Sequence, residues 1–136
     1  MKVLIINGPN LNLLGTREPE IYGTVSMADY LETLKTEFSS FELYYYQSNI
    51  EGEIINRLQK DDFDALIINP GAFTHYSYAI ADCLKNIRKP KVEVHISNIY
   101  KREEFRQKSV TAANTDAVLA GFGMDGYRLA ILSLKS

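Results

Sequence analysis

The chain has 136 residues and a formal net charge of −2, which suits one domain with a sizeable core and argues against a nucleic-acid partner. No apolar run is long enough to cross a bilayer, so we expect no membrane partner. The single cysteine, Cys83, excludes an internal disulfide, and the opening MKVLIING lacks the pattern of a signal peptide. We therefore expect one cytoplasmic domain over residues 1–136.

The predicted elements alternate between strands and helices along the chain. Short apolar runs rich in β-branched or aromatic residues predict strands, and apolar residues three and four positions apart predict helices. The expected strands are residues 2–7, 41–48, 64–70, 91–97 and 115–122. The expected helices are residues 26–38 with Ser26 as N-cap, 50–60, 77–88, a short turn at 102–107, and 125–134. This alternation predicts a three-layer, flavodoxin-like α/β fold with a five-stranded parallel sheet.

A long connection, GPNLNLLGTREPEIYG at residues 8–23, follows the first predicted strand. It has no apolar period, and connections of this length in compact domains are usually functional or disordered. It carries Asn10, Arg17 and Tyr22. In open parallel sheets ligands bind beyond the carboxyl ends of the strands, so this connection begins where a ligand site is expected.

Other reactive side chains also follow predicted strands. The third strand ends at Asn69 and leads to His75, and the fourth carries Glu93 and His95 two positions apart, hence on one face. Each feature taken alone has an ordinary explanation: Asn-Pro-Gly is often just a turn, a strand histidine is often part of the core, and loop arginines and tyrosines are usually solvated. The agreement of three strand ends favours a single site.

Several other kinds of site find little support. GFGMDG at residues 121–126 matches G-x-G-x-x-G, but no acidic residue follows about twenty positions on, as a dinucleotide site requires, so we expect a tight turn there. No P-loop motif is present, and the two histidines lie far apart in the sequence without an adjacent cluster of acidic or thiol ligands for a metal. Packing accounts for Cys83 and for the tyrosines at 44–46.

The remaining side chains suit acid–base chemistry without a metal or cofactor. A tyrosine, with an ordinary pKa of about 10, becomes a base when a nearby guanidinium favours its phenolate, and Arg17 is five residues from Tyr22. His95 suits proton donation to a leaving hydroxyl, with Glu93 to orient it or hold its proton. Proton abstraction beside a carbonyl, followed by loss of water, would use both groups.

Five motifs cover nearly the whole chain in order. They are NGPNLNLLGTREPEIYG at 7–23, QSNIEGEII at 47–55, INPGAFTHYSYAIADCL at 68–84, VEVHISNIYKREEFR at 92–106 and GFGMDGY at 121–127. Together they closely resemble the type II 3-dehydroquinate dehydratases, a shikimate-pathway family that converts 3-dehydroquinate to 3-dehydroshikimate without a cofactor. The resemblance implies anti elimination through an enolate, insensitive to borohydride, in contrast to the lysine Schiff base of the type I enzymes.

The resemblance also implies roles for the matched catalytic residues. Tyr22 would remove the proton at C2, kept ionised by Arg17, on a lid at about residues 8–23 that closes over substrate and is mobile when empty. His95, supported by Glu93, would protonate the departing C1 hydroxyl. Asn10 would help to stabilise the enolate through a bound water.

Further matched residues would bind the substrate. The carboxylate would meet the Asn69 side chain and the backbone amides of Ile96 and Ser97, and Arg102 would help to close the site. The ring hydroxyls would contact His75, Asp82 and Arg106. The family assembles as a dodecamer, a tetramer of trimers, in which the aspartate matching Asp82 reaches a neighbouring site.

The chain departs from the family pattern in two places. Ile50 stands where many relatives have His in QSNHEG, and SVTAA at residues 109–113 replaces a more usual SYLS. We expect neither departure to touch a matched catalytic position. Two other functions stay open at this point: a flavodoxin-like module that binds FMN or another small ligand, and an inactive family member with a structural or regulatory role.

Overall fold

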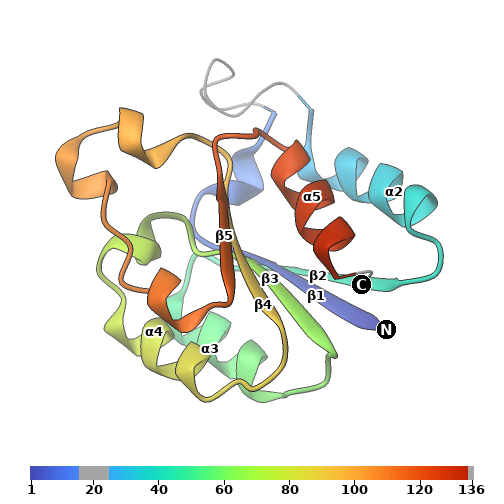
Figure 1. Ribbon diagram of the computed structural model, residues 1–136, viewed down its shortest axis with the longest axis horizontal. Helices are drawn as coiled ribbons and strands as arrows, with labels where there is room; N and C mark the ends of the chain where they lie inside the picture. The colour runs from blue at the N-terminus through green and yellow to red at the C-terminus, as the bar shows by residue number, and fades with distance from the viewer. Residues whose placement is uncertain (16–24, 135–136) are drawn as a thin grey trace.

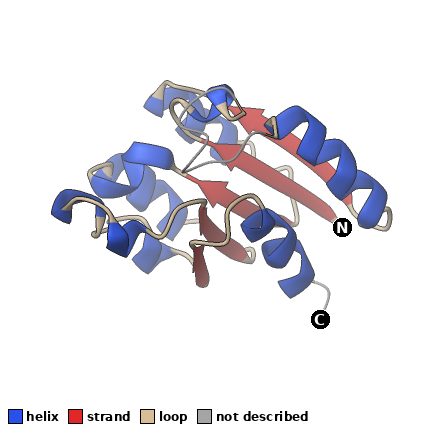
Figure 2. Ribbon diagram, turned by 90° about the horizontal axis from the view of Figure 1, so that it is seen from above, coloured by secondary structure: helices blue, strands red, loops and turns tan. Residues whose placement is uncertain are grey.

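The computed structural model describes residues 1–15 and 25–134, and shows a parallel sheet with helices on both faces (Figure 1, Figure 2). The strands are β1 (Lys2–Asn7), β2 (Glu42–Gln47), β3 (Ala65–Asn69), β4 (Lys91–His95) and β5 (Ala117–Ala120). The α-helices are α2 (Met27–Glu37), α3 (Glu51–Gln59), α4 (Tyr78–Lys85) and α5 (Asp125–Ser133). The strand order β2-β1-β3-β4-β5 is that of flavodoxin-like folds, so the predicted architecture is confirmed.

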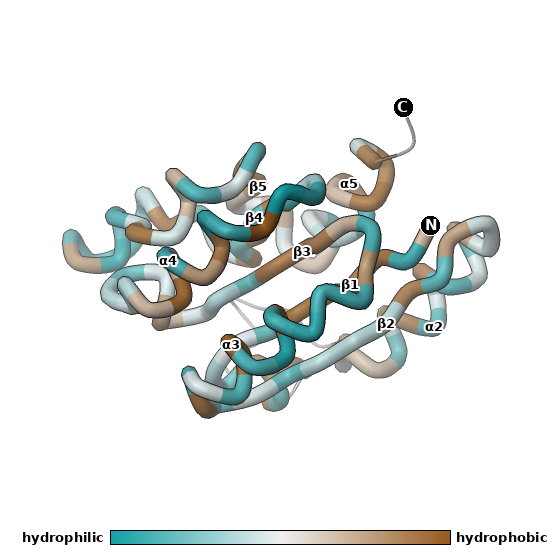
Figure 3. Tube along the Cα trace, turned by 90° about the horizontal axis from the view of Figure 1, so that it is seen from below, coloured by the Kyte–Doolittle hydropathy of each residue, from teal (hydrophilic) through white to brown (hydrophobic). Residues whose placement is uncertain are grey.

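Alternation along the buried strands builds two separate cores. Val3 and Ile5 of β1 face the layer formed by α2 and α5, whereas Leu4 and Ile6 face the layer formed by α3 and α4. The continuous apolar character of β3 appears as a largely brown tube in Figure 3. A strand covered on both faces needs apolar residues at every position, which is why these runs do not alternate with polar residues.

Several predicted elements end earlier than expected, and the ends of α4 and β4 have clear physical causes. The α4 helix, expected to reach residue 88, ends at Lys85, where the buried Lys91 side chain donates to the carbonyls of Leu84 and Ile87 at 2.7 and 2.6 Å. Such bonds satisfy carbonyls that the end of a helix leaves without partners. The β4 strand ends at His95 rather than at residue 97, because the backbone beyond it bonds to a turn at residues 121–123.

No helix in the described ranges is long and apolar enough to cross a membrane.

The ends of β1 and β3 approach each other closely at Gly8. Its amide donates to the carbonyl of Asn69 at 2.8 Å, and a Cβ added at Gly8 would lie far inside van der Waals contact with the carbonyl oxygen of Pro70. Only glycine permits this approach, because the obstructing atoms belong to the backbone. Gly8 therefore sets the spacing of the two strand ends that lead to Asn10 and His75.

We predict that Gly8→Ala lowers the free energy of unfolding by at least about 1–3 kcal/mol, because the strand ends must separate. Gly52→Ala in α3 is the matched control: no atom lies within 4 Å of its added Cβ, and alanine in a helix should raise stability by up to about 1 kcal/mol. Urea denaturation of both variants measures the difference. Equal stability of the two variants would contradict the role assigned to Gly8.

Candidate active site

A polar cavity of about 110 Å³ lies at the carboxyl ends of β1, β3 and β4. The chain leaves β1 toward β2 on one side and later returns to β3 on the other, so this is the point at which strand order reverses. The residues lining the cavity are Pro9, Asn10, Leu11, Asn69, Gly71, Ala72, His75, His95, Ile96, Ser97, Ile99, Arg102 and Arg106. The structure thus brings together seven residues expected to contact the substrate, and also Arg102, which is expected to help close the site.

His95 and Glu93 form a buried pair behind the cavity. The Nε2 atom of His95 lies 2.6 Å from Oε2 of Glu93, and the two residues are 5% and 0% exposed. Their spacing on one face of β4 produces this contact, as the sequence predicts. With Nε2 engaged by the carboxylate, Nδ1 is the ring nitrogen left to exchange a proton with a ligand in the cavity.

The Glu93 carboxylate also accepts hydrogen bonds from three hydroxyl groups. Thr111 donates to Oε1 at 2.5 Å, while Ser109 and Thr74 donate to Oε2 at 3.0 and 3.2 Å. Burial alone raises the pKa of Glu93, but the bonds from His95, Thr111 and Ser109 outweigh it and lower this pKa below its ordinary value. The carboxyl group is therefore held in its charged form.

This arrangement corrects one expectation from the sequence. The departure at residues 109–113 was expected to touch no matched catalytic position, and that is wrong for Ser109 and Thr111, which contact Glu93. Nothing local in the sequence indicates these contacts, since the two hydroxyls lie 16 and 18 positions from Glu93. The other departure, Ile50, is 58% exposed before α3 and does not line the cavity.

Beneath the cavity, buried amides and phenols form a chain of hydrogen bonds. The Tyr127 hydroxyl donates to Oδ1 of Asn7 at 2.6 Å and accepts from Nδ2 of Asn69 at 3.0 Å. Asn7 in turn donates to the Tyr45 hydroxyl at 3.2 Å, and the Gly71 amide donates to Oδ1 of Asn69 at 3.1 Å. These bonds fix the Asn69 side chain at the wall of the cavity, and burial raises the pKa of Tyr127, which keeps its hydroxyl protonated.

The start of the long connection is held by the QSN segment. Asn10 adopts a left-handed backbone conformation with φ of 68°, and its amide donates to Oδ1 of Asn49 at 2.9 Å. Gln47 donates both to that same oxygen and to the Gly8 carbonyl, each at 3.1 Å. Nothing in the sequence pattern indicates a role for Gln47 or Asn49, yet their side chains set the position of Asn10.

His75, Arg102 and Arg106 also line the cavity. The Nδ1 atom of His75 lies 2.7 Å from the Lys108 carbonyl, which identifies Nδ1 as the protonated nitrogen and leaves Nε2 as an acceptor. Burial lowers the pKa of His75, and the nearby charges of Arg106 and Arg102 lower it further. Arg106 is itself held by Glu103 at 3.0 Å. This part of the lining is cationic and suits an anionic ligand.

The G-x-G match at residues 121–126 forms the expected tight turn. Gly121 and Gly123 have φ of 91° and 60°, which favour glycine, and their amides donate to the carbonyls of His95 and Ile96 at 3.2 and 3.0 Å. These bonds orient the backbone that leads to Ser97. The turn therefore supports the wall of the cavity on which Ile96 and Ser97 lie.

The described part of the chain leaves two expected site residues untested and places a third outside the cavity. Arg17 and Tyr22 lie outside the described residues. Asp82 lies exposed on α4 and does not line the cavity of its own chain. Within residues 1–15 and 25–134, no cluster of three or more His, Cys, Asp or Glu side chains could hold a metal ion.

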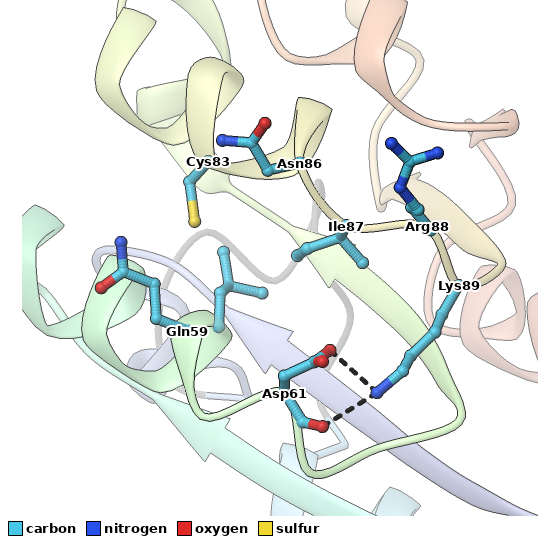
Figure 4. A pocket seen from close by; sticks show the side chains of 8 residues that line it. Gln59, Asp61, Cys83, Asn86, Ile87, Arg88 and Lys89 are labelled. Atoms are coloured by element: carbon cyan, nitrogen blue, oxygen red, sulfur yellow. Dashed lines mark hydrogen bonds and ion pairs between the residues drawn. The ribbon is translucent and has the colours of Figure 1, made fainter.

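A larger hollow of about 310 Å³ lies at the C-terminal ends of α3 and α4, away from the strand ends that form the site (Figure 4). The Lys89 side chain extends across this hollow, and its Nζ atom lies 2.8 Å from both the Oδ1 atom and the carbonyl oxygen of Asp61. Burial raises the pKa of the Cys83 thiol at its edge, which disfavours the reactive thiolate. Despite its size, this hollow holds no acid–base pair like that of His95.

A flavodoxin-like domain with an acid–base pair at its switch point belongs to the class of enzymes that transfer protons. The chain belongs to the family Dehydroquinase class II, whose model matches residues 1–135. It is 54% identical to the 3-dehydroquinate dehydratase of Thermotoga petrophila over 137 residues, covering 99% of this chain and 95% of the relative. The 3-dehydroquinate dehydratase of Carboxydothermus hydrogenoformans is 53% identical to this chain, and the match covers 98% of this chain and 90% of the relative.

Solved structures agree with this assignment. The type II dehydroquinase of Butyrivibrio crossotus superposes with a TM-score of 0.93 at 48% identity, covering 100% of this chain and 98% of that chain. The type II dehydroquinase of Propionibacterium acnes gives a TM-score of 0.94 at 41% identity, covering 98% and 94%. The family that the sequence motifs resemble is therefore confirmed.

We predict that Tyr127→Phe lowers the free energy of unfolding by about 1–3 kcal/mol, because it leaves buried amide groups of Asn7 and Asn69 without their partner. Tyr44→Phe is the matched control, since its hydroxyl bonds Glu42 on the exposed surface and its loss should change stability by less than about 0.5 kcal/mol. Urea denaturation compares the two variants. A Tyr127→Phe protein as stable as Tyr44→Phe would contradict the network.

Proposed function

We propose that this enzyme dehydrates 3-dehydroquinate to 3-dehydroshikimate without a cofactor, by anti elimination through an enolate. The observation that carries the proposal is the buried His95–Glu93 pair at the cavity of a chain that belongs to the Dehydroquinase class II family. A histidine held through Nε2 by a carboxylate is suited to deliver a proton from Nδ1. In the proposed reaction that proton goes to the departing C1 hydroxyl, which leaves as water.

The lining of the cavity suits an anionic substrate that carries hydroxyl groups. We assign the carboxylate to the backbone amides of Ile96 and Ser97 and to the Asn69 side chain, which the Tyr127 network holds in place. His75 and Arg106 would contact the ring hydroxyls, and Arg102 would add positive charge. Preorganised donors of this kind cost little reorganisation when the substrate binds.

We assign the removal of the C2 proton to a base on the long connection at residues 8–23. Tyr22 would remove it, with Arg17 favouring the phenolate, and Asn10 would stabilise the enolate oxygen through a water. The support for Tyr22 and Arg17 is the match of their motif to the family. Among the described residues, no lysine side chain lines the cavity, which disfavours a Schiff-base route.

We further propose that the active protein is an oligomer, with the dodecamer of the family as the expected form. Asp82 is exposed on α4, outside the cavity of its own chain, and so is free to serve a neighbouring site. A cytoplasmic location stays a prediction from the sequence.

The first experiment mixes the purified protein with 3-dehydroquinate and follows the ultraviolet absorbance of the conjugated enone product. We expect turnover that survives borohydride treatment in the presence of substrate. Tyr22→Phe should lower kcat by about 10²- to 10⁴-fold, the usual contribution of a general base. Tyr44→Phe, an equivalent change on the exposed surface of β2, should retain full activity.

Each alternative outcome has a definite meaning. A lysine adduct trapped by borohydride would replace the enolate route with a Schiff-base route. Absence of turnover in the assembled wild-type oligomer would favour the non-enzymatic family member, and flavin absorbance in the purified protein would favour the FMN-binding module.

A complementation experiment tests the role of Asp82. Asp82→Ala and His95→Ala should each be impaired alone, whereas oligomers reassembled from a mixture of the two should regain activity, because some sites then combine an intact His95 with an intact Asp82 from a neighbour. Reassembly of each variant with itself is the control. No gain in the mixture would mean that Asp82 acts within its own chain or not at all.

A further inference from the structure

The hydroxyls of Thr74, Ser109 and Thr111 form a compact cluster around the Glu93 carboxylate. Besides their bonds to the carboxylate, Thr74 Oγ1 lies 2.6 Å from Ser109 Oγ and 2.7 Å from Thr111 Oγ1. Thr74 and Thr111 are both fully buried. We refer to these three side chains as the hydroxyl cluster.

The number of hydroxyl protons in this cluster limits which hydrogen bonds can form at the same time. Each hydroxyl has one proton to donate, and the carboxylate oxygens of Glu93 are acceptors within reach of all three. Thr111 provides the one hydroxyl contact to Oε1, while Ser109 and Thr74 share Oε2 with His95. Each proton can go either to Glu93 or to a neighbouring hydroxyl. A hydroxyl that donates to the carboxylate favours its charged form, because the hydrogen bond stabilises the anion more than the neutral acid.

The cluster is assembled from segments distant in the sequence. Thr74 belongs to the turn that follows β3, whereas Ser109 and Thr111 lie in the segment that leads into β5. The Val110 amide donates to the Thr74 carbonyl at 2.7 Å and the Ala112 amide donates to Ser109 Oγ at 3.0 Å, which fixes the second segment against the first. None of the three residues lines the cavity, so none is placed to touch a ligand there.

We infer that Ser109 and Thr111 are positioning residues for acid catalysis: they hold Glu93 as an anion, which keeps the Nε2 proton of His95 in place and directs Nδ1 to the cavity. This inference rests on the proposed function. During the reaction His95 gives its Nδ1 proton to the leaving hydroxyl and keeps its Nε2 proton, which stays hydrogen-bonded to the Glu93 carboxylate. Loss of a hydroxyl should therefore impair proton donation without weakening substrate binding.

Few charged side chains lie near the His95–Glu93 pair. His95 is the titratable group in direct contact with Glu93, and His75, Arg102 and Arg106 lie further along the same cavity. From the elements on the other side, the described neighbours of Glu93 are the neutral hydroxyls. A shift in the protonation of Glu93 can therefore be traced to the hydroxyls when these charged side chains are unchanged.

The decisive variant is Thr111→Val, which keeps the shape of the side chain and removes the hydroxyl. It should raise the pKa of Glu93, so that the carboxyl group gains a proton at higher pH than in the wild type. We expect the acidic limb of the kcat profile to move upward by about one pH unit, a tenfold change in proton affinity, with KM unchanged. Thr111→Ser, which restores the hydroxyl, should restore the wild-type profile.

A matched control lies four residues away. Thr115 bonds the Ala112 carbonyl at 2.8 Å in the same segment and makes no contact with Glu93. Thr115→Val should leave the acidic limb in place, even if it lowers stability. Ser109→Ala supplies a second test should Thr111→Val fail to fold, and it should move the limb in the same direction.

A measurement without substrate separates this inference from the proposed function. The carboxyl carbon of Glu93, assigned by comparison with Glu93→Gln, is followed by NMR through a pH titration of the oligomer in ¹³C-glutamate-labelled protein. A midpoint that rises in Thr111→Val but not in Thr111→Ser or Thr115→Val supports the inference, whether or not 3-dehydroquinate is turned over. An unmoved midpoint in both Thr111→Val and Ser109→Ala, or an equal shift in Thr115→Val, overturns it, even in an active enzyme.

Discussion

The buried carboxylate of Glu93 is the group on which the rest of the site depends. An isolated charge without exposed surface is strongly destabilising, so the fold must surround it with donors. It does so with a histidine from the same strand and hydroxyls from two other segments. This requirement links the catalytic edge of the sheet to the course of the chain between β4 and β5, which would otherwise be a simple surface connection.

A second group of buried polar side chains, at the ends of β1 and β3, also needs hydrogen-bond partners from distant parts of the chain. Asn7 and Asn69 end two central strands where the apolar core meets the cavity, and Tyr127 reaches them from α5, 120 positions from Asn7 in the chain. An apolar side chain in place of Tyr127 would leave these amides without partners, whereas a small polar one would not fill the core. Tyr127 therefore supports both the packing of α5 and the orientation of the amides below the substrate site.

The sequence predicts the fold well, most clearly at β1, β3 and β4, which are covered on both faces. Continuous apolar runs, regular helical spacing and the order of elements are local features, so all five strands and the main helices follow from them. The contact between Glu93 and His95 is also local, since residues two apart on a strand share a face. The early end of α4 is not local, because it depends on a lysine that returns from β4.

The supporting residues of the site could not be predicted in this way. Serine and threonine occur throughout the chain without a period, and only the tertiary fold brings Thr74, Ser109 and Thr111 to one carboxylate. Gln47 and Asn49 are similar, since they act on the backbone of Gly8 and Asn10, 39 positions away. Family resemblance identifies residues that face the substrate more readily than those behind them, whose contacts depend on the particular chain.

The two proton transfers proposed for this enzyme place different demands on the fold. The acid must be available in one orientation, and His95 achieves this because its partner is buried and its strand is central to the sheet. The base must act from the opposite face of the substrate ring in an anti elimination, and we assign it to the connection at residues 8–23. The described start of that connection leaves β1 at Gly8 and is held at Asn10 by Gln47 and Asn49. A long connection at this strand end suits the stereochemistry proposed for the reaction.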